Sequence, residues 1–163
     1  RPSSATCRRK KEIDMGDGPF HQKPFEQRMA EMGDEAEGEF EARHDNVARF
    51  GFNRPPFTIQ HLPLTIRYTP DFIQSSPQQF VETVGMGKNG LKFKLEKLIA
   101  LSWWDQAMPV LIWAWSTPRQ NWASLYVSEL QRMIEKEEVP VGYFREGKAY
   151  FQIRPSLLEW GDG

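Results

Sequence analysis

The chain has 163 residues, a length typical of one compact domain. Hydrophobic residues make up 39% and charged residues 26%, which excludes a chain that is disordered along its whole length. The net charge of −1 excludes a uniformly basic protein, so any contact with nucleic acid must come from a local basic patch.

Cysteine content and hydropathy indicate the cellular compartment of the protein. Cys7 has no partner in the sequence, which excludes a disulfide framework and favours a reducing environment. No apolar run approaches the ~20 residues of a membrane span, and the N-terminal segment lacks the apolar core of a signal peptide. We therefore expect a cytoplasmic protein without membrane contact.

The N-terminal part of the chain divides into an arm and a helix. Residues 1–30 are rich in charge, glycine and proline without a sustained period, which predicts a flexible arm. Asp34 is typical of a helix N-cap, and Ala36 and Phe40 after it share one helical face, so we predict a helix over residues 34–44. The prolines at 55 and 56 must interrupt any regular element.

A series of short extended segments follows. The predicted strands or strand-like stretches are residues 57–60, 64–68, 72–73 and 80–84. The glycines at 85, 87 and 90 end the last of these strands in a loop.

The segment of residues 91–106 has two interpretations. Its apolar residues remain on one side for four turns, which favours a helix over residues 91–106. Leu91, Phe93 and Leu95 also alternate, and Asn-Gly stands just before them, so a hairpin is the alternative.

The sequence from residue 109 onward predicts a buried strand of the central sheet, followed by a C-terminal appendage. Residues 109–115 form a continuous apolar run, as in a strand with both faces covered. A helix over residues 124–137 and a hairpin of residues 141–144 and 149–153 follow. We therefore expect an α/β fold with a mixed central sheet flanked by helices. A single domain would span residues 31–163, with its core at 34–122 and a helix–hairpin appendage at 123–163.

Two carboxylates stand at strand positions in the middle of the chain. Asp71 follows Pro70 at the start of one extended stretch, and Glu82 lies inside the next strand. Such a pair can converge on one hard cation, because Mg²⁺ takes one or two carboxylates together with water and substrate phosphate oxygens. A cation held there polarises a phosphate and lowers the pKa of an attacking water. The pair indicates metal-assisted phosphate chemistry.

The residues around this pair resemble the PD-(D/E)XK nuclease superfamily. In that superfamily Pro-Asp precedes a strand bearing Glu-x-Lys, and the first helix often supplies a further Glu. Here residues 68–72 read Tyr-Thr-Pro-Asp-Phe and residues 37–40 read Glu-x-x-Phe, which looks most like TnsA-type transposon endonucleases and phage-encoded relatives. The resemblance covers residues 34–115, about half of the chain.

The resemblance implies a restriction-endonuclease-like core and hydrolysis of DNA phosphodiester bonds with Mg²⁺ or Mn²⁺. Asp71 and Glu82 would hold the metal, and Glu37 would be a further acidic catalytic residue. Glu41, one helical turn after Glu37, is the competing choice. A phage-encoded protein of this kind would act in the host cytoplasm on phage or mobile-element DNA.

One position departs from the superfamily pattern. The lysine expected two residues after Glu82 is Val84, which can neither orient water nor stabilise negative charge. Either another lysine supplies the charge or catalysis is lost. Lys88, in the glycine loop, and Lys94, on the predicted helix, are the candidates, and we favour Lys94 because a helix holds an ammonium group more precisely than a loop.

The lysines that follow Glu82 also predict a DNA contact. Lys88, Lys92 and Lys97 lie in a segment with a single acidic residue, Glu96, and Arg119 lies on a predicted loop further on. These four basic residues are the expected phosphate contacts.

Two functions from different classes fit the sequence. The first is a divalent-metal-dependent DNA endonuclease. The alternative is a nuclease-derived protein without catalysis that serves as a structural or DNA-docking subunit of a phage or transposon assembly. Both functions have DNA as a partner, and either a homodimer or a subunit of a nucleoprotein or virion assembly is expected.

Overall fold

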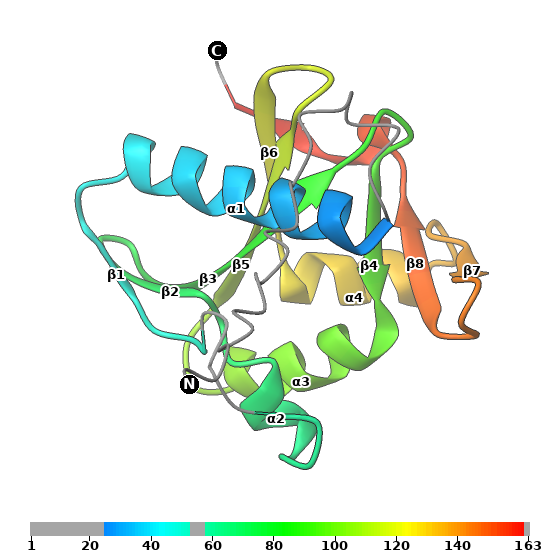
Figure 1. Cartoon of the computed structure of the whole chain (residues 1–163), viewed down its shortest axis with the longest axis horizontal. Coiled ribbons are helices and arrows are strands. Elements are labelled where there is room, and N and C mark those ends of the chain that lie inside the picture. The colour runs from blue at the N-terminus through cyan, green and yellow to red at the C-terminus, as the bar shows by residue number, and fades with distance from the viewer. Residues whose placement is uncertain (1–24, 53–57, 162–163) are drawn as a thin grey trace, which may run out of the picture.

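The computed structural model describes residues 25–52 and 58–161 (Figure 1). Most of the predicted arm therefore lies outside the described residues. Helix α1 (Phe25–Arg43) begins within the last part of that arm and passes through Asp34. The helix starts early because the residues before Asp34 include Glu, Gln, Arg, Met and Ala, all of which favour helix. Asp34 is thus an interior residue and not an N-cap.

The central sheet has six strands in the order β1-β2-β3-β5-β6-β9. Their bounds are β1 (Val47–Arg49), β2 (Phe72–Ser75), β3 (Gln78–Met86), β5 (Val110–Ser116), β6 (Asn121–Tyr126) and β9 (Glu159–Trp160). Strands β3 and β5 are parallel and all other neighbours are antiparallel, so the sheet is mixed. The expected fold class, α/β with a mixed central sheet flanked by helices, is confirmed.

A second, smaller sheet has the order β4-β8-β7 (Figure 1). It contains β4 (Leu91–Lys94), β7 (Val141–Tyr143) and β8 (Ala149–Ile153), all antiparallel. The C-terminal hairpin predicted from the sequence is therefore present as β7 and β8. A short 3-10 helix (Pro155–Leu157) then leads to β9 in the central sheet.

Helices cover both faces of the central sheet (Figure 1). On one face, Ala36 and Phe40 of α1 pack with Phe72, Val81 and Trp113. On the other face lie α3 (Leu95–Asp105) and α4 (Val127–Glu135), and the short α2 (Leu64–Arg67) packs beside α3. Within residues 25–52 and 58–161, no helix combines the length and the apolar character needed to cross a bilayer.

The crossover between the two central strands is as predicted. Strands β3 and β5 are direct parallel neighbours, with Glu82 opposite Ile112, and α3 lies between them in sequence. The connection contains β4 as well as α3, so it is a crossover with an additional strand before the helix.

The segment predicted as a helix over residues 91–106 is partly a strand. Leu91 and Phe93 are buried and pair with Ile153 and Phe151 of β8, and the helix begins only at Leu95. The alternation of Leu91 and Phe93 correctly indicated a strand, but this strand pairs with β8, which is distant in sequence. The alternative hairpin with residues 80–84 does not form.

Three further boundaries differ from the predictions. Residues 64–67 form α2 and not a strand. The predicted segment of residues 64–68 is too short for its hydrophobic pattern to distinguish the helical period of 3.6 residues from the strand period of two. Residues 58–60 are not a strand, and Phe57 lies outside the described residues. Residues 124–126 end β6, so the predicted helix starts at Val127. The central sheet thus continues past the core bound at residue 122 and includes β9 from the predicted appendage.

Candidate active site

Asp71 and Glu82 are brought together by the pairing of β2 with β3. The register pairs Phe72 with Val81, and Asp71 immediately precedes β2. The negative charge of Asp71 raises the pKa of Glu82, so the two carboxylates lie close together. Asp71 therefore reaches the site from the start of β2, where Pro70 precedes it, and Glu82 reaches it from the centre of β3.

Thr83 fixes the Asp71 carboxylate. Its backbone N–H and its side-chain hydroxyl both donate to Asp71 Oδ2, each at 2.8 Å. Thr83 is buried, so these hydrogen bonds hold one carboxylate oxygen in place away from bulk water. The sequence analysis did not single out this residue. The position of a hydroxyl residue next to Glu82 on a predicted strand could have identified Thr83 as a hydrogen-bond donor to the site.

Glu82 is the most buried of the candidate acidic residues. Its side chain is 2% exposed, and Lys97 Nζ donates a hydrogen bond to its Oε1. Burial, followed by the negative charge of Asp71, raises the pKa of Glu82 from its ordinary 4.5 to about 8, although the Lys97 ammonium opposes this shift. Glu82 Oε2 has no hydrogen-bond partner among the described residues. This buried oxygen is available to a ligand.

Lys97 lies in the first turn of α3 and points at the sheet. Its side chain is about one quarter exposed. Burial favours the neutral amine, but the charges of Glu82 and Asp71 outweigh burial and raise the pKa of Lys97 above its ordinary value. The lysine therefore stays charged beside both carboxylates.

Glu37 approaches the site from α1. Its negative charge contributes to the raised pKa of Glu82, which places it in the same electrostatic environment. Arg49 donates to Glu37 Oε2 at 2.7 Å and also forms a two-pronged ion pair with Glu41. Glu41 is more exposed than Glu37, and its charge is not among the main causes of the Glu82 shift. Of the two competing residues, Glu37 is the one coupled to the site.

The two lysines expected to replace the missing one lie elsewhere. Lys94 is the last residue of β4, and its Nζ lies 5.8 Å from the centre of the Phe144 ring. Lys88 is exposed in the loop between β3 and β4. Among the described residues, neither forms a hydrogen bond or ion pair with Asp71 or Glu82. Lys97, expected as a DNA contact, is the lysine that reaches the carboxylates.

Val84 and Glu82 lie on the same side of β3. Val84 follows Glu82 by two residues on β3, so both side chains project to the α3 side of the sheet. Val84 packs against the hydrophobic cluster between the sheet and α3. Lys97 extends from α3 toward the face of the sheet on which Glu82 and Val84 lie.

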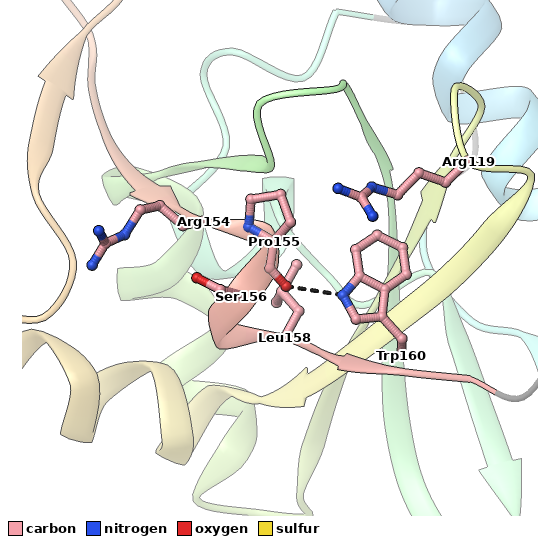
Figure 2. Close-up of a pocket in the computed structure, with 6 residues that line it drawn as sticks. All are labelled: Arg119, Arg154, Pro155, Ser156, Leu158 and Trp160. Carbon is pink, nitrogen blue, oxygen red and sulfur yellow. Dashed lines mark hydrogen bonds between the residues drawn. The ribbon is translucent and has the colours of Figure 1, made fainter.

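The remaining basic candidates, Lys92 and Arg119, are in separate places. Lys92 is exposed on β4. Figure 2 shows Arg119 at a cavity of about 580 Å³, where its guanidinium lies 4.8 Å from the centre of the Trp160 ring. Trp160 Nε1 donates to the carbonyl of Pro155 at 2.9 Å. Neither Asp71 nor Glu82 lines this cavity, so the cavity at Arg119 is separate from the carboxylate site.

Asp71 and Glu82 are the donor residues for the metal that the resemblance implies. Among residues 25–52 and 58–161, no group of three or more His, Cys, Asp or Glu side chains is arranged to hold an ion. Mg²⁺, however, commonly uses only one or two carboxylates and completes its shell with water and substrate oxygens. Asp71 and Glu82 meet that requirement, and the unpartnered Oε2 of Glu82 is a free ligand atom. The residues fit Mg²⁺ or Mn²⁺ and do not fit zinc.

No protein-family model, curated protein or solved structure matches the chain.

Proposed function

We propose that this protein is a divalent-metal-dependent endonuclease of the PD-(D/E)XK type that hydrolyses DNA phosphodiester bonds. The observation that carries the proposal is the buried Glu82, which accepts a hydrogen bond from Lys97 and lies near the negative charge of Asp71. A buried carboxylate, a second carboxylate on the adjacent strand and a lysine on the facing helix make up the acidic and basic groups of such a site. The elements α1, β1, β2, β3, α3 and β5 occur in the order that the resemblance implies, with α2 inserted before β2 and β4 inserted before α3.

Each residue has a distinct task in this proposal. Asp71 and Glu82 would hold the metal, which when bound polarises the phosphate and lowers the pKa of water. Thr83 orients Asp71 through two hydrogen bonds. The Lys97 ammonium stabilises the negative charge that develops on the phosphoryl oxygens. Glu37 adds negative charge that favours cation binding. We place the substrate in phage or mobile-element DNA, on the resemblance alone.

The test is cleavage of duplex, single-stranded and branched DNA with Mg²⁺ or Mn²⁺. We expect nicking or cutting that stops with EDTA. Asp71→Asn and Glu82→Gln keep the side-chain size but remove metal-binding charge, so each should abolish cleavage while the domain stays folded by circular dichroism. Glu135→Gln, at an exposed position of α4, is the matched control and should cut like the wild type.

The alternative function predicts a different pattern. A nuclease-derived docking subunit would bind DNA, would cut no substrate with any metal, and would be indifferent to Asp71→Asn. Val84 is the observation that favours it, because the usual position of the lysine is occupied by an apolar side chain. Binding without cleavage across all three DNA classes would replace the nuclease proposal with this one.

A further inference from the structure

The outward face of the small sheet carries lysines and aromatic rings. Leu91 and Phe93 of β4 point inward and are almost completely buried, so the alternate residues Lys92 and Lys94 point outward. Tyr150 of β8 is the register partner of Lys94, and therefore lies on the same face.

The rings on this face hold the two ammonium groups. Lys92 Nζ lies 4.9 Å from the centre of the Tyr150 ring and 6.0 Å from that of Phe144, and Lys94 Nζ lies 5.8 Å from that of Phe144. The Phe144 and Tyr150 rings contact each other, with centroids 4.5 Å apart. We call Lys92, Lys94, Phe144 and Tyr150 the basic-aromatic face. Cation–π contacts of this kind restrict the lysines without neutralising them.

A glycine makes the arrangement possible. A Cβ on Gly142 of β7 would lie 2.6 Å from Cζ of Tyr150, so the Tyr150 ring rests directly on the backbone of its register partner. Any larger residue at 142 would displace the ring. Both strands of the hairpin therefore fix the position of the Tyr150 ring, β8 by carrying it and β7 by providing the glycine on which it packs.

The charge of the face is not cancelled within the protein. Among the described residues, neither Lys92 nor Lys94 forms an ion pair. Glu96, the nearest acidic residue in sequence, is taken by Lys148 at 2.7 Å. Partial burial and the charges of Lys148 and Lys97 lower the pKa of Lys94, and the charges of Glu96 and Glu146 oppose this shift. Two lysines that form no ion pair favour contact with a polyanion.

The face adjoins the carboxylate site. Lys94 is the N-cap residue of α3 and Lys97 lies three residues on, in its first turn. The positive charge of Lys97 lowers the pKa of Lys94, so the two ammonium groups lie close together. One strand of duplex DNA presents a phosphate about every 3.4 Å of helix axis. Consecutive phosphates can therefore reach Lys97 and the face together.

We propose that the basic-aromatic face binds the DNA phosphates that flank the bond cut at Asp71 and Glu82. This inference rests on the proposed function, and it assigns the C-terminal hairpin a role in holding the substrate. The Lys97 ammonium contacts the reacting phosphate, and Lys92 and Lys94 contact its neighbours on one side. Lys94 is then a binding residue and not the relocated catalytic lysine.

The first test measures DNA binding of the full chain in EDTA, where no cleavage occurs, at 50–200 mM salt. Loss of two phosphate contacts in K92Q/K94Q should make the slope of log K against log salt shallower by about 1.8. Arg132→Gln on α4 removes the same kind of charge from an exposed helix position and is the control. An unchanged slope in K92Q/K94Q, with normal binding by the wild type, overturns the inference.

The second test locates the contacts on the DNA. Single phosphates of the substrate are replaced by uncharged methylphosphonates. Those that weaken wild-type binding should cluster on one side of the cut, and the same replacements should have no effect on K92Q/K94Q. Equal penalties in both proteins overturn the inference. If K92Q/K94Q loses binding but the wild type cuts no DNA, the face stands and the nuclease proposal fails.

A third variant separates the rings from the lysines. Tyr150→Leu removes the ring that orients Lys92 and should weaken binding several-fold, whereas Tyr150→Phe keeps the ring and should bind like the wild type. Equal binding by all three proteins would contradict a role for the aromatic support.

Discussion

Lys97 of α3 donates a hydrogen bond to Glu82 of β3, across the interface between the helix and the sheet. The superfamily pattern would place a lysine on the strand itself, at the position of Val84. A lysine on the facing helix reaches the same side of the sheet, so the charge is supplied by a different element. In the proposed nuclease, Lys97 would take the role of the lysine on the strand.

Replacing Lys97 tests this relationship directly. Lys97→Met keeps the aliphatic stem and removes the ammonium, so we expect cleavage to fall on the order of 10²–10³-fold. DNA affinity at moderate salt should change little, in contrast with K92Q/K94Q. Single-turnover cleavage and EDTA binding assays separate the two effects. A Lys97→Met protein that cuts at the wild-type rate would exclude Lys97 from the chemistry.

The fold should survive that substitution. Leaving a buried charge without its partner typically costs about 3–5 kcal/mol, but Glu82 can take up a proton because its pKa is already raised to about 8. Thermal unfolding of Lys97→Met in EDTA should therefore remain cooperative.

The raised pKa of Glu82 also predicts how stability depends on pH. The folded state binds the Glu82 proton more tightly than the unfolded state, in which the pKa is near the ordinary 4.5. The stabilisation is complete below pH 4.5 and is lost as the pH rises through about 8. In EDTA, this group should lower the free energy of unfolding by up to about 1.4 kcal/mol per pH unit between these limits.

Urea unfolding at several pH values measures this slope. Glu82→Gln cannot titrate, so the difference in slope between wild type and Glu82→Gln isolates the contribution of Glu82. Parallel pH profiles for the two proteins would show that Glu82 keeps an ordinary pKa.

Thr83 is predicted to act as a positioning residue. Thr83→Val keeps the shape and removes the hydroxyl that donates to Asp71 Oδ2, leaving only the backbone donor. A hydrogen bond to a charged group is worth about 1.5–3 kcal/mol, so turnover should fall roughly tenfold or more. The Mg²⁺ concentration for half-maximal rate should rise as well. Thr83→Ser retains the hydroxyl and should recover most of both values, which a loss of packing alone would not explain.

Close packing of α1 against β3 gives a prediction about stability. A Cβ on Gly85 would lie 2.6 Å from Met32 Cβ and 2.9 Å from the Met32 carbonyl oxygen, so Gly85→Ala must displace α1. We expect a loss of about 1–3 kcal/mol in chemical denaturation. Gly87→Ala has no atom within 4 Å of the new Cβ, and should change stability by less than about 0.5 kcal/mol. Similar values for both variants would contradict the close contact.

The strands that carry the two carboxylates could be predicted from the sequence, whereas the lysine beside them could not. Strand β5 is an almost continuous apolar segment and β3 is rich in β-branched and aromatic residues, and their pairing through a helix follows from general rules of chain connection. Asp71 lies near Glu82 because the short turn at residues 76–77 lets β2 pair with β3. Local pattern was sufficient for these features.

The position of the lysine could not be predicted, because it depends on where the helix starts. A helix over residues 91–106 would put Lys94 on the same face as Leu98 and Leu101. Residues 91–94 instead pair with β8, more than fifty residues away, so the helix begins at Leu95. Leu95 and Ile99, predicted to face inward, are 37% and 47% exposed, and Lys97 turns inward.

The sharpest prediction moves the lysine back to the strand. Glu82 and Val84 project to the same side of β3, so an ammonium at 84 can reach the site that Lys97 now serves. Val84→Lys combined with Lys97→Met should recover a substantial part of the cleavage lost in Lys97→Met, because what matters is a fixed positive charge beside the developing negative charge. The long aliphatic stem can cover the hydrophobic cluster that Val84 now contacts. Val84→Met with Lys97→Met is the control for size without charge, and should stay as slow as Lys97→Met alone. Recovery by both double variants would point to packing. Recovery by neither, in proteins that remain folded and bind DNA, would mean that the geometry of α3 is essential to the lysine.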